Sequence, residues 1–105
     1  MKIELQLGDR LFEWDENKNE ININKHGLSF KTAAKVFLDK NRKNYYDFEH
    51  SINEDRWITI GKVKNVLFVV YTERGDKTRI ISAREAQPSE KEKYYGNGNI
   101  YIESK

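Results

Sequence analysis

Apolar and polar residues alternate at the beginning of the chain. Ile3, Leu5 and Leu7 are separated by polar residues, and this period of two is typical of a strand with one buried side. A glycine–aspartate pair follows, which favours a tight turn, and apolar residues return in the segment 11–14. The pattern predicts a short N-terminal β-hairpin.

A helix is predicted between Asp15 and Gly27. Asp15 can cap its beginning, Gly27 can end it, and basic residues occupy the last turn, where they suit the helix dipole. The interior is rich in asparagine, which is a weak helix former. We therefore expect this helix to gain stability by docking Ile21 and Ile23, or Leu28, against the rest of the domain.

A second helix carries the clearest amphipathic pattern. Ser29 can cap it, and Phe30, Ala33, Ala34 and Phe37 fall at positions i, i+3, i+4 and i+7. These residues form one apolar stripe, so the helix is expected to pack on a sheet through them.

Beyond Asp39 the period changes from that of a helix to that of strands. The apolar run 66–70 reads as a central strand, and Arg74–Lys77 as the tightest turn. Pro88 then begins a last helix, Ser89–Tyr95, and a glycine–asparagine stretch ends it. The four predicted strands are Asn44–Phe48, Arg56–Gly61, Val66–Glu73 and Thr78–Ala83.

Together the elements predict an α+β fold. It has two N-terminal helices, a four-stranded antiparallel meander sheet and a C-terminal helix, with the hairpin as an N-terminal extension. At 105 residues the chain fits one domain, with residues 1–11 as the extension and residues 96–105 as a C-terminal tail that is loose or pairs with a partner.

Composition narrows the class of protein. The chain has no cysteine, which excludes disulfides and thiolate chemistry and fits a reducing compartment. Its beginning lacks the layout of a signal peptide, and no apolar segment is long enough to span a membrane. We therefore expect a soluble, cytoplasmic protein that makes no membrane contact.

The net charge of +2 is too small to identify a nucleic-acid-binding protein. The distribution of charge is more informative, because the segment 62–84 contains six basic residues and only two acidic ones, Glu73 and Asp76. This segment could present a basic surface to phosphate groups.

Three segments resemble the BrnT family of ribonuclease toxins. The first combines Phe-Glu-Trp-Asp at 12–15 with Lys-His-Gly-Leu-Ser-Phe at 25–30 and the apolar positions to residue 37. The second is His50-Ser51 with Glu54, Arg56 and Gly61. The third runs from Val69 to Gly75 and continues through Arg-Ile-Ile-Ser-Ala-Arg at 79–84, with Glu90 and Tyr94 after it.

The resemblance implies a RelE-like fold and RNA cleavage without metal or other cofactor. It also implies the toxin role of a type II toxin–antitoxin system, in which the enzyme inhibits translation and growth until a DNA-binding BrnA-like antitoxin neutralises it. The two proteins would form a hetero-oligomer that binds promoter DNA through the antitoxin. Two features depart from the family, the segment 2–11 and the asparagine-rich first helix.

Metal-free RNA cleavage needs a base for the 2′-hydroxyl, an acid for the leaving oxygen, and cations for the developing charge. His50 is the one histidine predicted in a loop, and histidine exchanges protons near neutral pH. Glu49 or Glu54 could share this role, or His50 could simply order the turn. His26 is better explained as a group that binds free carbonyls at a helix end.

The arginines can act as phosphate ligands in place of a metal. Arg79 and Arg84 are five positions apart, so they lie on opposite faces if their strand is regular and share a phosphate only if it ends or bulges. Arg56 and Arg74 come from neighbouring strand ends. The alternative is that these arginines pair with Glu54, Glu73 and Glu85 on a solvated surface.

Other residues have both a functional and a structural interpretation. Tyr71 is either strand packing or a hydroxyl of the site. Trp14 and Trp57 could stack bases, but we expect both in or beside the core. The candidate catalytic residues are thus His50, Glu54, Arg56, Arg79 and Arg84, the candidate RNA-binding residues are Tyr71, Thr72, Arg74 and Lys77, and no metal ligand is predicted.

Two other functions fit the same sequence. A small α+β domain could bind RNA or a protein without chemistry, with its arginines spread along a groove and His50 away from them. The chain could also act as a co-repressor through its antitoxin, whose acidic residues would contact and cover the basic strand.

Overall fold

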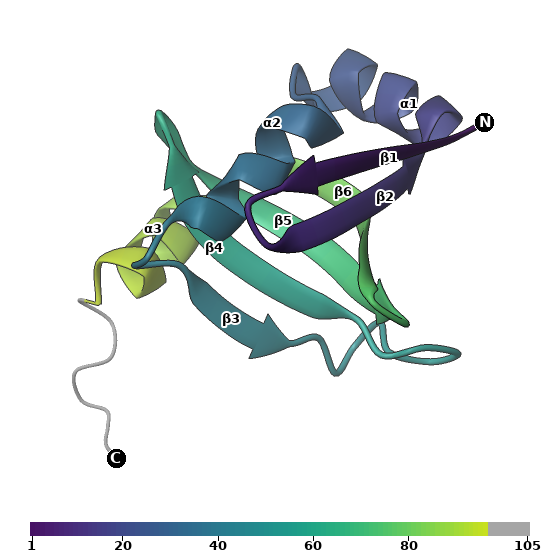
Figure 1. The fold of residues 1–105 in the computed structure, drawn as a ribbon. Helices are drawn as coiled ribbons and strands as arrows, with labels where there is room; N and C mark the ends of the chain where they lie inside the picture. The colour runs from purple at the N-terminus through teal and green to yellow at the C-terminus, as the bar shows by residue number, and fades with distance from the viewer. Residues whose placement is uncertain (97–105) are drawn as a thin grey trace.

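The computed structural model describes residues 1–96 (Figure 1). The predicted tail, residues 96–105, lies outside this range except for Gly96. The elements in chain order are β1 (Lys2–Leu7), β2 (Arg10–Asp15), α1 (Glu16–His26), α2 (Phe30–Ala34), the 3-10 helix η1 (Lys35–Leu38), β3 (Lys43–Tyr46), β4 (Trp57–Val63), β5 (Asn65–Arg74), β6 (Lys77–Glu85) and α3 (Pro88–Tyr95).

All the strands described belong to one mixed sheet of six strands in the order β1-β2-β6-β5-β4-β3. The predicted antiparallel meander is present as β3 to β6. The prediction was wrong to make it the whole sheet, because β2 pairs in parallel with β6 from Leu11 opposite Lys77 to Glu13 opposite Arg79. This pairing satisfies backbone groups that β6 would otherwise expose at a sheet edge.

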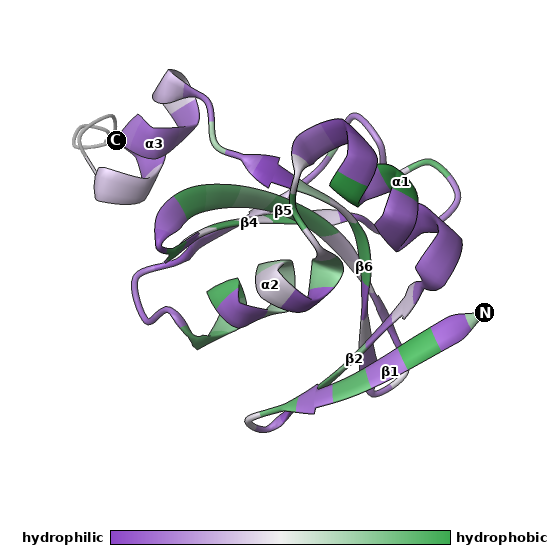
Figure 2. Cartoon of the chain, turned by 90° about the horizontal axis from the view of Figure 1, so that it is seen from above, coloured by the Kyte–Doolittle hydropathy of each residue, from purple (hydrophilic) through white to green (hydrophobic). Residues whose placement is uncertain are grey.

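Helices cover both faces of the sheet (Figure 2). On one, here called the α2 face, α2 and η1 bury an aromatic and aliphatic cluster that includes Phe12, Phe30 and Val69. On the other, the α3 face, Tyr94 of α3 packs with Ile60 and other apolar residues over one end of the sheet. Elsewhere on the α3 face, Arg79 of β6 lies opposite Thr72 of β5, and Lys77 lies opposite Arg74.

Helix α1 begins at the predicted cap, since Asp15 Oδ1 accepts a hydrogen bond from the N–H of Asn17. The predicted docking of Ile21 and Ile23 was wrong, because Ile21 is 62% exposed and Ile23 40% exposed, whereas the alternative, Leu28, packs against the core cluster. Instead the helix docks through buried Asn22, whose side chain donates to the carbonyl of Ala83 at 2.8 Å and accepts from its N–H at 3.2 Å. An asparagine side chain thus pairs with the edge of β6 beyond the end of β2.

Strand β6 contains a bulge that changes which side chains share a face. Val70 of β5 lies opposite Ser82, whereas the next residue, Tyr71, lies opposite Ile80. Ile81 is therefore an extra residue, and the alternation of side chains reverses across it. Arg79 and Arg84 consequently both lie on the α3 face, as the sequence allowed for a bulged strand but not for a regular one.

Candidate active site

The loop between β3 and β4 is closed at its neck by hydrogen bonds. The N–H of Asp47 donates to the carbonyl of Arg56 at 2.9 Å. The hydroxyl of Ser51 donates to the carbonyl of Asp47 at 2.6 Å and accepts from the N–H of Arg56 at 2.8 Å. Thr72 is buried and its hydroxyl donates to the carbonyl of Asp55 at 2.6 Å, so this predicted RNA-binding residue anchors the loop to β5.

His50 stands on this loop and is held by Asp47. Its Nδ1 lies 3.0 Å and 3.2 Å from the two carboxylate oxygens of Asp47, whose side chain is only 10% exposed. Since a carboxylate accepts hydrogen bonds, this contact favours the tautomer with the proton on Nδ1, in which Nε2 is free to accept a proton. Asp47 was missed by the sequence interpretation, although its spacing of three residues before His50 is a detectable signal.

Two arginines converge on Glu54 beside this histidine. The guanidinium of Arg74 lies 3.2 Å from Glu54 Oε1, and that of Arg56 lies 4.0 Å from Oε2. His50, Glu54 and Arg56 together line a cavity of about 280 Å³ with Ile52 and Asn53. These two arginines, Glu54, His50 and its partner Asp47 form the loop cluster (Asp47, His50, Glu54, Arg56 and Arg74).

The other predicted basic residues lie outside the loop cluster and have carboxylate partners. Arg79 contacts Glu13 at 3.3 Å, and Lys77 contacts Glu4 at 2.7 Å. The contact with Lys77, through its hydrogen bond and its charge, lowers the pKa of the Glu4 carboxyl.

Arg84 makes the best-formed of these ion pairs. It binds both carboxylate oxygens of Glu90, at 2.8 Å and 2.9 Å, and its guanidinium lies 4.0 Å from the centre of the Phe68 ring. Burial raises the pKa of the Glu90 carboxyl, but the hydrogen bonds from Arg84 and from the N–H of Gln87 outweigh burial, so the pKa is below its ordinary value of 4.5.

Aromatic residues divide between the core and the loop. Tyr71 is buried on the α2 face, and its hydroxyl donates to the Asn44 side chain at 2.8 Å. Trp14 is in the core, as expected. Trp57 is half buried at the sheet end, where its ring packs edge-on against Tyr46.

His26 lies exposed in the last turn of α1. Within residues 1–96 its ring makes no hydrogen bond, so the predicted contact with free carbonyls is not formed. The N–H of Gly27 instead closes the helix on the carbonyl of Ile23.

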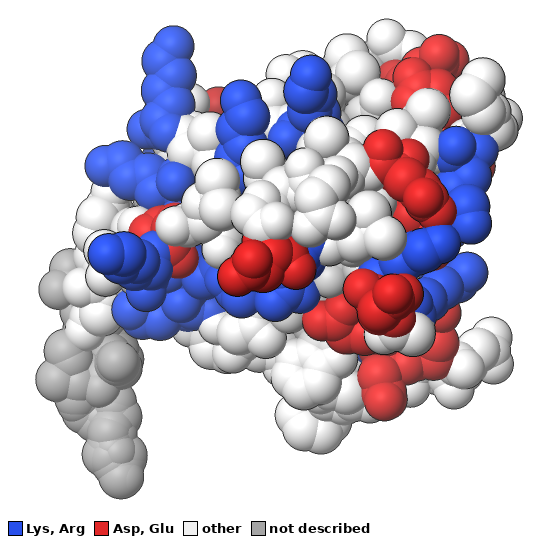
Figure 3. All heavy atoms as spheres, viewed as in Figure 1, with Lys and Arg blue, Asp and Glu red and all other residues white. Residues whose placement is uncertain are grey.

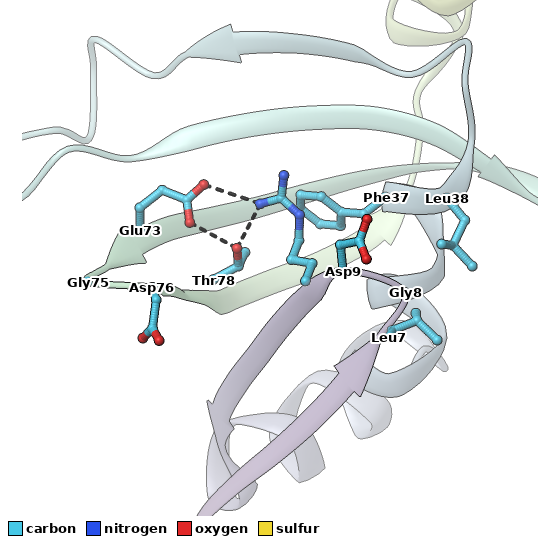
Figure 4. Close-up of a pocket in the computed structure, with 10 residues that line it drawn as sticks. Leu7, Gly8, Asp9, Phe37, Leu38, Glu73, Gly75, Asp76 and Thr78 are labelled. Atoms are coloured by element: carbon cyan, nitrogen blue, oxygen red, sulfur yellow. Dashed lines mark hydrogen bonds and ion pairs between the residues drawn. The ribbon is translucent and has the colours of Figure 1, made fainter.

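A larger cavity, of about 690 Å³, lies on the α2 face between the β1–β2 turn, η1 and the β5–β6 turn (Figure 4). Its arginine, Arg10, is bound to Glu73 at 3.3 Å and to the hydroxyl of Thr78 at 2.8 Å. The cavity has no histidine among its lining residues, so the loop cluster holds the better set of groups for proton transfer. Residues 1–96 include no group of three or more side chains placed to bind a metal, and no helix in this range is long and apolar enough to cross a membrane.

Comparison with known proteins gives a consistent result. The model of a family described as the ribonuclease toxin, BrnT, of type II toxin–antitoxin systems matches residues 14–90. Among solved structures, the crystal structure of the Brucella abortus ribonuclease toxin BrnT matches with 29% sequence identity and a TM-score of 0.57, over 70% of this chain and 92% of the Brucella chain. No curated protein sequence matches the chain.

Proposed function

The chain belongs to the BrnT family of ribonuclease toxins of type II toxin–antitoxin systems, and we propose that it cleaves RNA without a metal ion, with the reacting groups in the loop cluster. The observation that carries the proposal is the position of His50, which is oriented by Asp47 and lines one cavity with Arg56 and Glu54. A proton acceptor beside an arginine is the minimum set for attack by a 2′-hydroxyl.

His50 has the geometry of a general base. Asp47 holds Nδ1, so Nε2 would take the proton of the 2′-hydroxyl as its oxygen attacks the adjacent phosphorus. The same oxygen forms the 2′,3′-cyclic phosphate while the bond to the 5′-oxygen breaks. The proton for that leaving oxygen would come from the His50 imidazolium formed in the first step, or from Glu49 in its protonated form, because Glu54 is paired with Arg74 as a carboxylate.

Arg56 and Arg74 would stabilise the charge that develops on the phosphate. Arg56 can exchange Glu54 for a phosphate, because its ion pair is long at 4.0 Å and its side chain is 34% exposed. Two guanidinium groups around one phosphate would supply the charge that a metal ion supplies in other nucleases.

Arg79 and Arg84 are assigned a different role in this proposal. Each is held by a well-buried carboxylate, so displacement by phosphate would leave Glu13 or Glu90 without its partner. We therefore assign these two residues to folding. RNA contacts by Lys77 remain part of the proposal, because Glu4, its partner, is exposed.

The family implies an antitoxin partner. We propose that the antitoxin is BrnA-like, that it covers the loop cluster, and that an acidic segment of it replaces the phosphate on Arg56 and Arg74. Release from it would then permit cleavage of cellular RNA and arrest translation and growth. Binding of promoter DNA by the complex would occur through the antitoxin.

The proposal can be tested with the purified full-length chain and a single-stranded RNA of about 20 nucleotides in the presence of EDTA. We expect cleavage that gives 2′,3′-cyclic phosphate and 5′-hydroxyl ends. An RNA with a 2′-deoxy sugar at the cleaved position should resist, because it lacks the attacking oxygen. Loss of cleavage in EDTA, or products with 5′-phosphate ends, would contradict it.

The rival function, binding without chemistry, gives a different result in the same assay. A protein of that kind would bind the RNA and leave it intact, with or without EDTA.

A further inference from the structure

Four lysines converge at the end of the sheet opposite the loop cluster. Lys43 begins β3 and lies opposite Ile60 of β4. Lys62 is two residues after Ile60 in β4, so its side chain lies on the same α3 face. Lys40 precedes β3, and Lys93 of α3 lies 5.4 Å from the centre of the Tyr45 ring. Figure 3, which looks onto the α2 side of the sheet, shows lysine and arginine side chains with some acidic ones among them near the beginning of β3, and a mixture of acidic and basic side chains at the right. These lysines (Lys40, Lys43, Lys62 and Lys93) are called the lysine patch.

The lysine patch differs from every candidate phosphate ligand of the loop cluster and of β6 in having no ion pair within residues 1–96. The carboxylate in its centre is Asp39, which accepts from the Tyr94 hydroxyl at 2.6 Å and from the N–H of Lys62 at 2.8 Å. Lys43 also interacts with the charge of Asp39, so this carboxylate offsets part of the positive charge. Four lysines around this one carboxylate leave a surplus of positive charge, which suits the phosphates of a polyanion.

Aromatic side chains accompany the lysines. Lys43 lies 6.0 Å from the centre of the Tyr94 ring, and Tyr95 next to it is 55% exposed. Lysines beside an exposed aromatic ring match single-stranded nucleic acid, whose phosphates need cations and whose bases stack on rings. A purely acidic protein segment would bind the lysines but has no base or ring to stack on the exposed tyrosine.

The lysine patch and the loop cluster lie at opposite ends of β4. From Arg56 to Lys62 the chain rises about 20 Å, at about 3.3 Å per residue. Between them the α3 face presents half-buried Ile58 and Tyr45. An RNA held at both ends would run along the β3–β4 side of this face, and one too short to span it would contact only the loop cluster.

We propose that the lysine patch is an RNA-docking surface, separate from the reacting groups, that binds the phosphates of a single strand several nucleotides away from the cleaved bond. The proposal rests on the proposed function for its substrate, an RNA, and adds a second contact region that sets how long an RNA must be to bind well.

The test compares Lys40→Gln/Lys62→Gln with a control that loses the same charge elsewhere, Lys18→Gln/Lys25→Gln, both exposed on α1. Fluorescence anisotropy would follow binding of a labelled, unstructured 20-nucleotide RNA by each full-length protein from 50 to 200 mM salt. We expect the patch variant to bind roughly tenfold more weakly at low salt, with a salt slope smaller by about 1.4, since each lost phosphate contact on a single strand removes about 0.7. The control should match the wild type.

A second measurement separates this proposal from the proposed function. Cleavage of a dinucleotide by the patch variant should proceed at the wild-type rate, whereas the KM for the 20-nucleotide RNA should rise. If the wild type binds the long RNA through the patch but cleaves nothing, the docking surface stands and the nuclease proposal fails. If the wild type cleaves RNA and the patch variant binds it normally, the docking surface is overturned. Equal weakening in the patch variant and the control would also overturn it.

Discussion

The basic side chains of β6 and those of the lysine patch differ in how their charge is used. Arg79 and Arg84 each contact a carboxylate that is nearly buried, with Glu13 5% and Glu90 14% exposed. In the lysine patch, Lys40 and Lys62 are exposed and have no carboxylate partner within residues 1–96. Basic residues of β6 are therefore structural, and those of the lysine patch are available to a ligand.

The comparison shows why a local count of charges is misleading. Bases outnumber acids in the segment 62–84, yet its arginines find partners elsewhere in the chain. Glu13 comes from β2, 66 residues before Arg79, and Glu4 from β1, 73 residues before Lys77. Both carboxylates belong to the N-terminal hairpin, which precedes the residues matched by the family. In this chain the hairpin therefore neutralises part of the basic strand.

The largest effect on stability is expected from Glu13→Leu. The substitution leaves Arg79, which is 21% exposed, without its counter-charge, whereas Lys2 keeps Glu4 at 3.9 Å. We expect the free energy of unfolding in urea to fall by about 2 kcal/mol, less than for a fully buried pair because Arg79 retains contact with water. Glu13→Leu/Arg79→Met should recover most of the loss. An unchanged urea midpoint for Glu13→Leu would show that the pairing is not structural.

A smaller effect is expected from Arg84→Met, which keeps the contact with Phe68 but removes the bonds to Glu90. At pH 7 the unfolding free energy should fall by about 1.5 kcal/mol. Because the pKa of Glu90 is lowered in the folded state, its stabilising charge is fully present above the ordinary value of 4.5 and is lost as the pH falls below it.

The difference between wild type and Arg84→Met should therefore shrink as unfolding is measured from pH 7 down to about 3. Arg74→Met is the matched control, since its pair with Glu54 is more exposed and should contribute less than 1 kcal/mol. A difference that stays constant down to pH 3 would contradict the contribution of Glu90.

The smallest effect is expected in the lysine patch. Lys40→Gln/Lys62→Gln should change the free energy of unfolding by less than about 0.5 kcal/mol, because neither side chain has a partner to lose within the described residues. Urea unfolding at pH 7 measures this directly. A loss above 1 kcal/mol would mean that these lysines stabilise the fold and would remove the contrast with β6.

Sequence reasoning located the elements that local signals determine. Asp15 and Ser29 cap their helices as predicted, since a cap depends on residues two or three positions away. Gly27 ends α1 in the left-handed conformation that the prediction assigned to it. These features need no knowledge of the tertiary structure.

Features that depend on contacts distant in sequence were not predicted. The parallel pairing of β2 with β6 and the bulge at Ile81 produce no hydrophobic periodicity that could be recognised in the sequence. Asn22 looked like a weak helix former, and only its place beside the edge of β6 gives it a role. For the site, the sequence pointed to His50, Glu54 and Arg56, which line one cavity, but it also selected Tyr71, which the structure buries on the opposite face.

The central claim is that proton transfer occurs at the loop cluster, and the cleavage rate of His50→Gln tests it most directly. His26→Gln is the matched control, because both histidines are exposed and, among residues 1–96, only His50 has a carboxylate partner. We predict that kcat for a single-stranded RNA falls at least about 100-fold in folded His50→Gln, with RNA affinity retained, and stays at the wild-type value in His26→Gln. A His50→Gln protein that cleaves RNA at the wild-type rate would contradict the account.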